Sequence, residues 1–133
     1  MLVDKDLQKA VAQLMEGNQI HLSFDGSDIN LRVVDEASKL VISTSVFYGG
    51  NYIPMSVRKS IGEKLSNHSE IRTFLTVDEQ HYQVNLHYLG HAHTLSHHHL
   101  KDLLEQFGSI AEKWRVYLNE HGKNDLIYVH KHK

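Results

Sequence analysis

A broad apolar stripe on one predicted helix, residues 96–120, constrains the fold more than any other feature of the sequence. Its apolar side chains recur at alternating steps of four and three, at Leu100, Leu104, Phe107, Ala111, Trp114 and Leu118. This spacing is typical of a helix with one buried face, and Leu103, Ile110 and Tyr117 widen that face. Because a wide apolar face needs a large apolar partner, and the preceding segments alternate apolar and polar residues, we expect that partner to be a sheet.

The other periodic segments complete the predicted fold. In chain order they are a helix from Asp4 or Asp6 to about 15, strands over 19–24, 29–34 and 39–47, a helix over 55–65, and strands over 71–77 and 82–88. The short connections between strands favour antiparallel pairing. We therefore predict an α+β fold of order α-β-β-β-α-β-β-α, with helices on one face of a mostly antiparallel five-stranded sheet.

The length of 133 residues fits a single domain over 1–133, with 123–133 as a C-terminal extension. Gly122 is placed to end the long helix, and residues 126–129 then form either a short strand or an extension that packs on a neighbour. No apolar run reaches the roughly 20 residues of a membrane span, and no secretion signal is evident, so we expect a cytoplasmic protein without membrane insertion. The net charge of −2 and scattered basic residues argue against direct nucleic-acid binding.

Histidines before and at the start of the long helix suggest metal chemistry at first sight. They are His81, His87, His91, His93, His97, His98 and His99. However, the stretch 87–99 contains no carboxylate, and three consecutive histidines on a helix point about 100° apart. The chain has no cysteine, no nucleophile elbow and no phosphate loop. We therefore expect no metal site, no cofactor and no enzyme, and rank a histidine-metal enzyme as the least favoured function.

The sequence also contains more apolar residues than one sheet face and its helices need. Val34, Val41, Phe47 and Phe74 are predicted to point to the face opposite the helices. Val57, Ile61 and Leu65 form a second row, on the helix over 55–65. Several apolar residues on one outer face indicate a surface that a partner covers. The alternative is that both groups belong to the core in a different register.

These features together resemble a known family. The element order, the size, the absent cysteines and the lack of a catalytic motif resemble class I type III secretion chaperones, and residues 1–7 and 95–101 are most similar to a chlamydial member. The resemblance implies a small cytoplasmic dimer, or a heterodimer with a second chaperone, that holds a segment of a secreted effector or gate protein. It also implies contact with the sigma subunit of RNA polymerase. A transcription regulator that binds sigma or core subunits is therefore the alternative function, and both activities can coexist.

The same resemblance assigns two sets of surface residues. The dimer interface would use the helix over 54–65 and the strand over 71–77, through Val57, Ile61, Leu65 and Phe74. The client would lie on the first helix and the sheet, against Leu7, Val11, Leu14, Val34, Val41 and Phe47. The chain departs from the family in being less acidic and richer in histidine.

Overall fold

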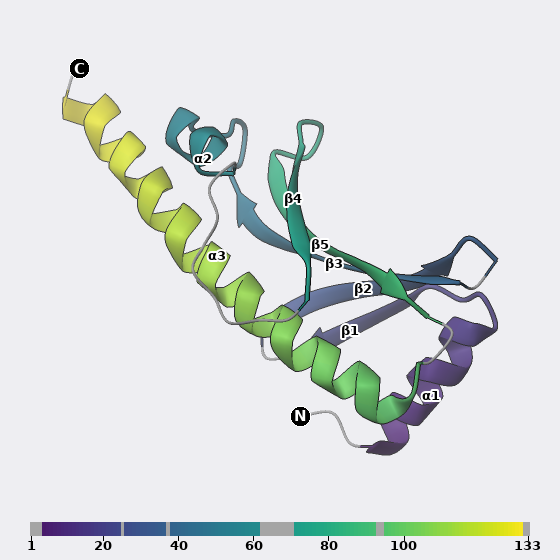
Figure 1. Cartoon of the computed structure of the whole chain (residues 1–133). Coiled ribbons are helices and arrows are strands. Elements are labelled where there is room, and N and C mark those ends of the chain that lie inside the picture. The colour runs from purple at the N-terminus through teal and green to yellow at the C-terminus, as the bar shows by residue number, and fades with distance from the viewer. Residues whose placement is uncertain (1–3, 25, 37, 62–70, 93–94, 132–133) are drawn as a thin grey trace.

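The chain folds into one five-stranded sheet and three helices (Figure 1). The computed structural model describes residues 4–24, 26–36, 38–61, 71–92 and 95–131, and it describes the side chains of those between 5 and 122. In chain order the elements are α1 (Asp4–Met15), β1 (Ile20–Phe24), β2 (Ser27–Val34), β3 (Lys39–Tyr48), α2 (Met55–Ser60), β4 (Thr73–Asp78), β5 (Gln83–His91) and α3 (His97–Lys131). The predicted α+β class and element order are confirmed.

All neighbouring strands are antiparallel, in the spatial order β1-β2-β3-β5-β4. The meander β1-β2-β3 and the hairpin β4-β5 join where β5 pairs with β3, so they form one sheet. Its inner face is lined by fully buried side chains: Ile29, Leu31, Leu40, Ile42, Val84 and Leu86. Four more apolar residues on this face are half-buried against the same core: Leu22, Phe24, Val33 and Leu75. Alternation with a period of two therefore identified the inner face correctly.

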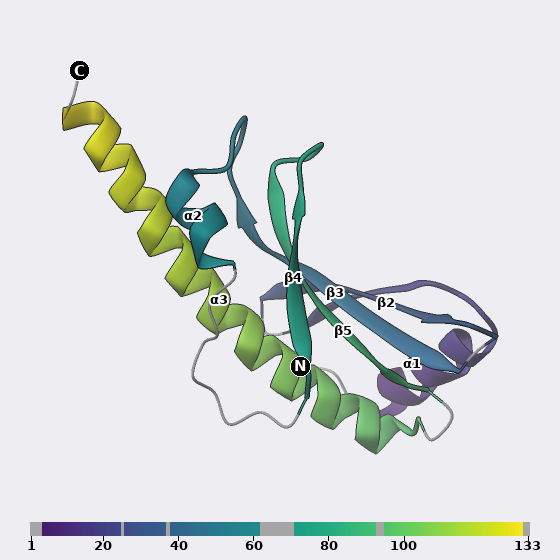
Figure 2. The same cartoon turned by 45° about the horizontal axis from the view of Figure 1, so that its top comes forward.

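Helices α1 and α3 lie on the same side of the sheet, and α3 runs the length of the molecule (Figures 1 and 2). The six residues of the predicted stripe at the four-and-three spacing, from Leu100 to Leu118, are each at most 7% exposed, and Tyr117 at its margin is half-buried. Ser96 forms the N-cap, because its Oγ accepts a hydrogen bond of 3.2 Å from the backbone N–H of His99. Helix α2 packs on the second half of α3, where the Ser56 hydroxyl donates to the carbonyl of His121 at 2.9 Å.

The prediction that Gly122 ends the long helix is wrong. Helix α3 continues through Gly122 to Lys131, so residues 126–129 are helical rather than a short strand. A Cβ at Gly122 would lie 3.1 Å from Cε1 of Phe47, so the helix backbone lies close against that ring. Packing against β3 therefore outweighs the poor helix propensity of glycine. In Figure 1 the last turns of α3 extend beyond α2.

The prediction that Phe47 points to the outer face is also wrong. Strand β3 has a bulge between Ser45 and Phe47, where the pairing moves from Asn85 directly to Val84 of β5. The extra residue puts two consecutive side chains on the buried side, Val46 and Phe47, at 2% and 8% exposure. Nothing in a period-two pattern marks this bulge.

Candidate protein-binding surfaces

Four of the side chains predicted to contact a client or a second subunit lie in the core of the single chain. Leu7 and Leu14 of α1 are 1% and 0% exposed, because α1 turns this row toward α3 and the sheet. Phe47 packs beneath α3, and Val57 of α2 is 0% exposed. A partner could reach these side chains only if the chain opened. Val11 and Ile61 are half-buried against the same core, and Leu65 lies outside the described residues.

The outer sheet face carries the other predicted client and interface residues. Val34 and Val41 are half-buried there and do not join the core, and Phe74 of β4 is 51% exposed. Leu89 is a further outward apolar residue, at 48% exposure, and it pairs with Val41 across β3 and β5. Leu89 was not among the predicted surface residues, because the predicted strand ends at residue 88. Continuing the alternation to His91 would have found it.

His87 of β5 organises the middle of this outer face. Its ring stacks on that of Phe74, with centroids 5.1 Å apart and planes 16° from parallel. Its Nε2 lies 2.7 Å from the Thr76 hydroxyl, which can donate to a neutral imidazole. Burial, and then the positive charge of Arg32, lower the pKa of His87. The imidazole is therefore held in its neutral form, as part of an apolar surface.

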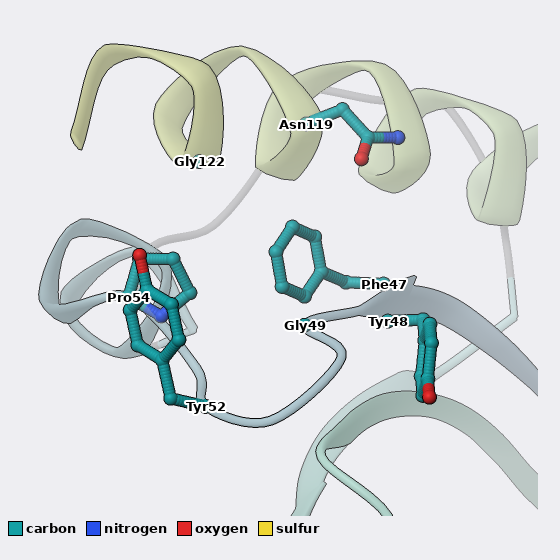
Figure 3. A pocket seen from close by; sticks show the side chains of 7 residues that line it. All are labelled: Phe47, Tyr48, Gly49, Tyr52, Pro54, Asn119 and Gly122. Carbon is teal, nitrogen blue, oxygen red and sulfur yellow. The ribbon is translucent and has the colours of Figure 1, made fainter. Parts of the chain in front are cut away.

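Three tyrosines and a methionine gather near the far end of β3 and form what we call the tyrosine end. Its members are Tyr48, Tyr52, Met55 and Tyr82, which are 67%, 44%, 62% and 38% exposed. Beside it is a pocket of about 170 Å³, lined by Phe47, Tyr48, Gly49, Tyr52, Pro54, Asn119 and Gly122. Figure 3 shows the Phe47 ring directed toward α3 and the Tyr48 ring directed away from it. Exposed tyrosine and methionine are typical of protein interfaces.

Polar contacts fix the position of the tyrosine end. Arg58 of α2 makes a two-pronged ion pair with Glu79, with contacts of 2.6 and 3.0 Å, and its hydrogen bonds lower the pKa of Glu79. Asp78 accepts from the backbone N–H groups of Gln80 and His81 at 3.1 and 3.2 Å, which shapes the β4-β5 turn. Tyr82 follows in a left-handed conformation with φ of 55°, which is unfavourable for a bulky residue.

The sheet edges offer backbone groups as well. Strand β4 pairs with β5 on one side and has no other neighbour within the described sheet. Its free N–H and C=O groups can therefore pair with a strand from another chain. The predicted dimer interface includes this strand, and that assignment stays a prediction.

The histidines spread over several elements. His81 pairs with Asp78 at 2.8 Å on the β4-β5 turn, and His87 lies on the outer sheet face. The rings of His97 and His98 at the start of α3 lie 4.0 Å apart and are tilted by 38°. Among the described residues no three His, Asp or Glu side chains come together as a metal site, and His93 lies outside them. Within the same ranges no helix is long and apolar enough to cross a membrane.

Comparison with known proteins finds similarity at the level of structure. No family model and no curated protein matches the sequence. One chain of the ExsC–ExsE complex shares 18% identity over 86% of this chain and 92% of its own, with a TM-score of 0.63. A chain of the heterodimeric ExoU–SpcU complex from the type III secretion system of Pseudomonas aeruginosa shares 12% identity over 88% of this chain and 98% of its own, with a TM-score of 0.58.

A third similar structure is the Yersinia pestis type III secretion chaperone SycH in complex with a fragment of YscM2. It shares 12% identity over 84% of this chain and 99% of that chain, with a TM-score of 0.55. At these identities the likeness concerns the backbone. The chain therefore has the α+β fold found in these type III secretion complexes.

Proposed function

We propose that the chain is a type III secretion chaperone, which binds an unfolded segment of a secreted effector or gate protein and keeps that protein competent for export. The observation that carries the proposal is the fold, which matches one chain of the ExsC–ExsE complex over 86% of this chain. SycH, with a similar fold, is itself described as a type III secretion chaperone in complex with a protein fragment. The resemblance noted in the sequence independently implies the same family.

The proposed activity requires binding surfaces and no chemical step. An extended client would cover exposed apolar side chains of the outer face that the dimer leaves free, such as Leu89. Because the chaperone would bind only the unfolded segment, binding would shift the folding equilibrium of that segment toward the unfolded state by mass action. The protein is accordingly proposed to have no enzymatic activity and no cofactor.

The proposed working unit is a dimer in the cytoplasm, formed with a second copy or with a second class I chaperone. Phe74 on the edge strand β4 and Met55 on α2, at 51% and 62% exposure, are the exposed apolar residues near the predicted interface. Joining two subunits there would remove apolar surface from water and leave other parts of the outer face for the client.

Capture of the untagged protein from its native cells tests the proposal. We expect mass spectrometry to identify a secretion substrate or a second chaperone, and light scattering to give the mass of a defined complex. Capture of neither kind of protein would contradict the proposed function.

A matched pair of variants locates the contact surface. Phe74→Ser and Val116→Ser each change a side chain that is 51% exposed, the first on the outer sheet face and the second on α3. We expect Phe74→Ser to lower the amount of captured protein and Val116→Ser to leave it unchanged. An equal effect of both would argue against the outer face.

The other two functions remain separable in the same experiment. Contact with the sigma subunit of RNA polymerase rests on the sequence resemblance, and capture of sigma or core subunits without a secretion substrate would favour a transcription regulator. A histidine-metal enzyme predicts stoichiometric metal after purification without a metal-affinity column. A folded, metal-free protein would remove that alternative.

A further inference from the structure

The register of the sheet brings a basic side chain, which forms no ion pair with any described residue, together with apolar side chains on the outer face. Arg32 of β2 pairs with Val41 of β3, and Val41 pairs with Leu89 of β5. This row of three crosses strands that lie side by side in Figure 1. His87 and Phe74 are directly paired in the neighbouring row. These five residues are called the outer patch below.

The outer patch is apolar and accessible to a partner. Leu89 and Phe74 are 48% and 51% exposed, and Val41 is half-buried. The Phe74 ring covers one face of the His87 imidazole, which extends the apolar surface from β4 to β5. Contiguous exposed apolar side chains, rather than single ones, mark an interaction site.

Charge distinguishes this patch from an ordinary apolar one. Arg32 is exposed and forms no ion pair within the described residues. The outward lysine at the start of β3, Lys39, already has a partner, because its Nζ lies 3.6 Å from Oδ2 of Asp35. Carboxylates at outward strand positions occur at strand ends, Asp28 near the start of β2 and Asp78 at the end of β4. The centre of the outer face is therefore positive although the whole chain has a net charge of −2.

We propose that the outer patch selects client segments in which an apolar residue and a carboxylate are two positions apart. This rests on the proposed chaperone function and names the chemistry of its client. In an extended segment, residues two apart face the same side, so one can cover Val41 and Leu89 while the other reaches Arg32. A guanidinium pairs with a carboxylate through two parallel hydrogen bonds. This pairing fixes the orientation of the carboxylate as well as attracting it.

Two other occupants fit the patch less well. In a symmetric dimer formed by this face, the same patch from each copy would meet, which brings two positive patches together and supplies no carboxylate to either Arg32. A nucleic acid would require more phosphate-binding cations than this patch supplies, and its apolar side chains would remain uncovered. Both are outcomes that the test below can detect.

The test is fluorescence anisotropy with the full chain and three labelled peptides. In the acidic peptide, serine alternates with five other residues, which are in order valine, glutamate, leucine, glutamate and valine. One control peptide has glutamine in place of both glutamates, and the other has lysine in place of both. We expect the acidic peptide to bind about fivefold more tightly than the glutamine peptide, equivalent to about 1 kcal/mol, and the lysine peptide to bind most weakly. Added salt should reduce this preference.

Variants connect the preference to its residues. Arg32→Gln should remove the preference for glutamate, Arg32→Lys should retain part of it, and Lys113→Gln, on an exposed position of α3, should leave it intact. Leu89→Ser should weaken the binding of all three peptides by the same factor. A thermal melt of each variant shows that it is folded.

Equal binding of the three peptides, no binding, or a preference that survives Arg32→Gln would overturn the proposal. Tighter Arg32-dependent binding of a single-stranded oligonucleotide would replace it with a nucleic-acid site, and a dimer lost in Arg32→Gln would replace it with a subunit contact. A secretion substrate captured equally by the wild type and Arg32→Gln would overturn this inference and leave the chaperone function standing. Capture of no substrate would contradict the chaperone function instead.

Discussion

The two glycines inside α3 should respond differently to alanine, although both lie in the helix interior. Replacing glycine by alanine in a helix interior gains about 1 kcal/mol from backbone entropy alone. At Gly108, an added Cβ would meet Cδ1 and Cε1 of Phe24 at 3.7 and 3.9 Å, which is ordinary van der Waals contact. The full gain should therefore appear, and Gly108→Ala should stabilise the chain by about 1 kcal/mol.

At Gly122 the same methyl group meets a side chain that is already packed. The added Cβ would lie 3.1 and 3.3 Å from Cε1 and Cζ of Phe47, so the ring must shift. Overpacking of this kind costs about 1–3 kcal/mol, which cancels or exceeds the gain in helix propensity. Gly122→Ala should therefore be at least about 1 kcal/mol less stable than Gly108→Ala.

Urea unfolding of the two variants and the wild type at one protein concentration measures this difference. Thermal melting gives a second measure, because a stabilisation of about 1 kcal/mol raises the melting temperature of a chain of this size by roughly 3–5 °C. Combining Gly122→Ala with Phe47→Leu should recover part of the loss, because the smaller side chain vacates the contact. Destabilisation by Gly108→Ala, or equal stability of the two alanine variants, would refute the reasoning.

Three further changes test other parts of the structure. Phe107→Ala removes a ring that is 0% exposed and should cost about 3–5 kcal/mol in urea unfolding, whereas Val116→Ala on the exposed side of α3 should change little. Tyr82→Gly should stabilise the chain by about 1 kcal/mol, because glycine adopts a φ of 55° without strain; a lower urea midpoint would show that the ring contributes to folding. The lowered pKa of His87 means that its protonation opposes folding, so stability should fall as pH drops below the unfolded value of about 6.5. The melting temperature of His87→Gln should depend less on pH between about pH 7 and 5 than that of the wild type. An unchanged pH dependence would contradict this assignment.

The fold could be predicted from the regular spacing of apolar residues along the helices and strands. The stripe from Leu100 to Leu118 and the alternation through Leu31 and Ile42 are local properties, because a helix repeats every 3.6 residues and a strand every two. Burial of one face of each element then leaves few ways to assemble them. The element order and the inner sheet face could therefore be predicted.

The predicted binding residues depended on information that the patterns lack. Leu7, Leu14 and Val57 were assigned to partners from a resemblance, yet each is at most 1% exposed in the single chain. An apolar row on a helix looks the same whether it faces the chain's own core or another molecule. Only the packing of α1 and α2 on α3 distinguishes the two cases.

The sequence by itself determined the type and order of the elements and which face of each is apolar. The tertiary structure decided where the bulge in β3 turns Phe47 inward and why α3 continues through Gly122. It also placed Arg32 beside Val41 and Leu89, with no ion-pair partner in the part of the chain that the structure describes. The physical reason is that periodicity is set by neighbours along the chain. Bulges, close contacts and charge isolation are set by residues brought together across the sheet.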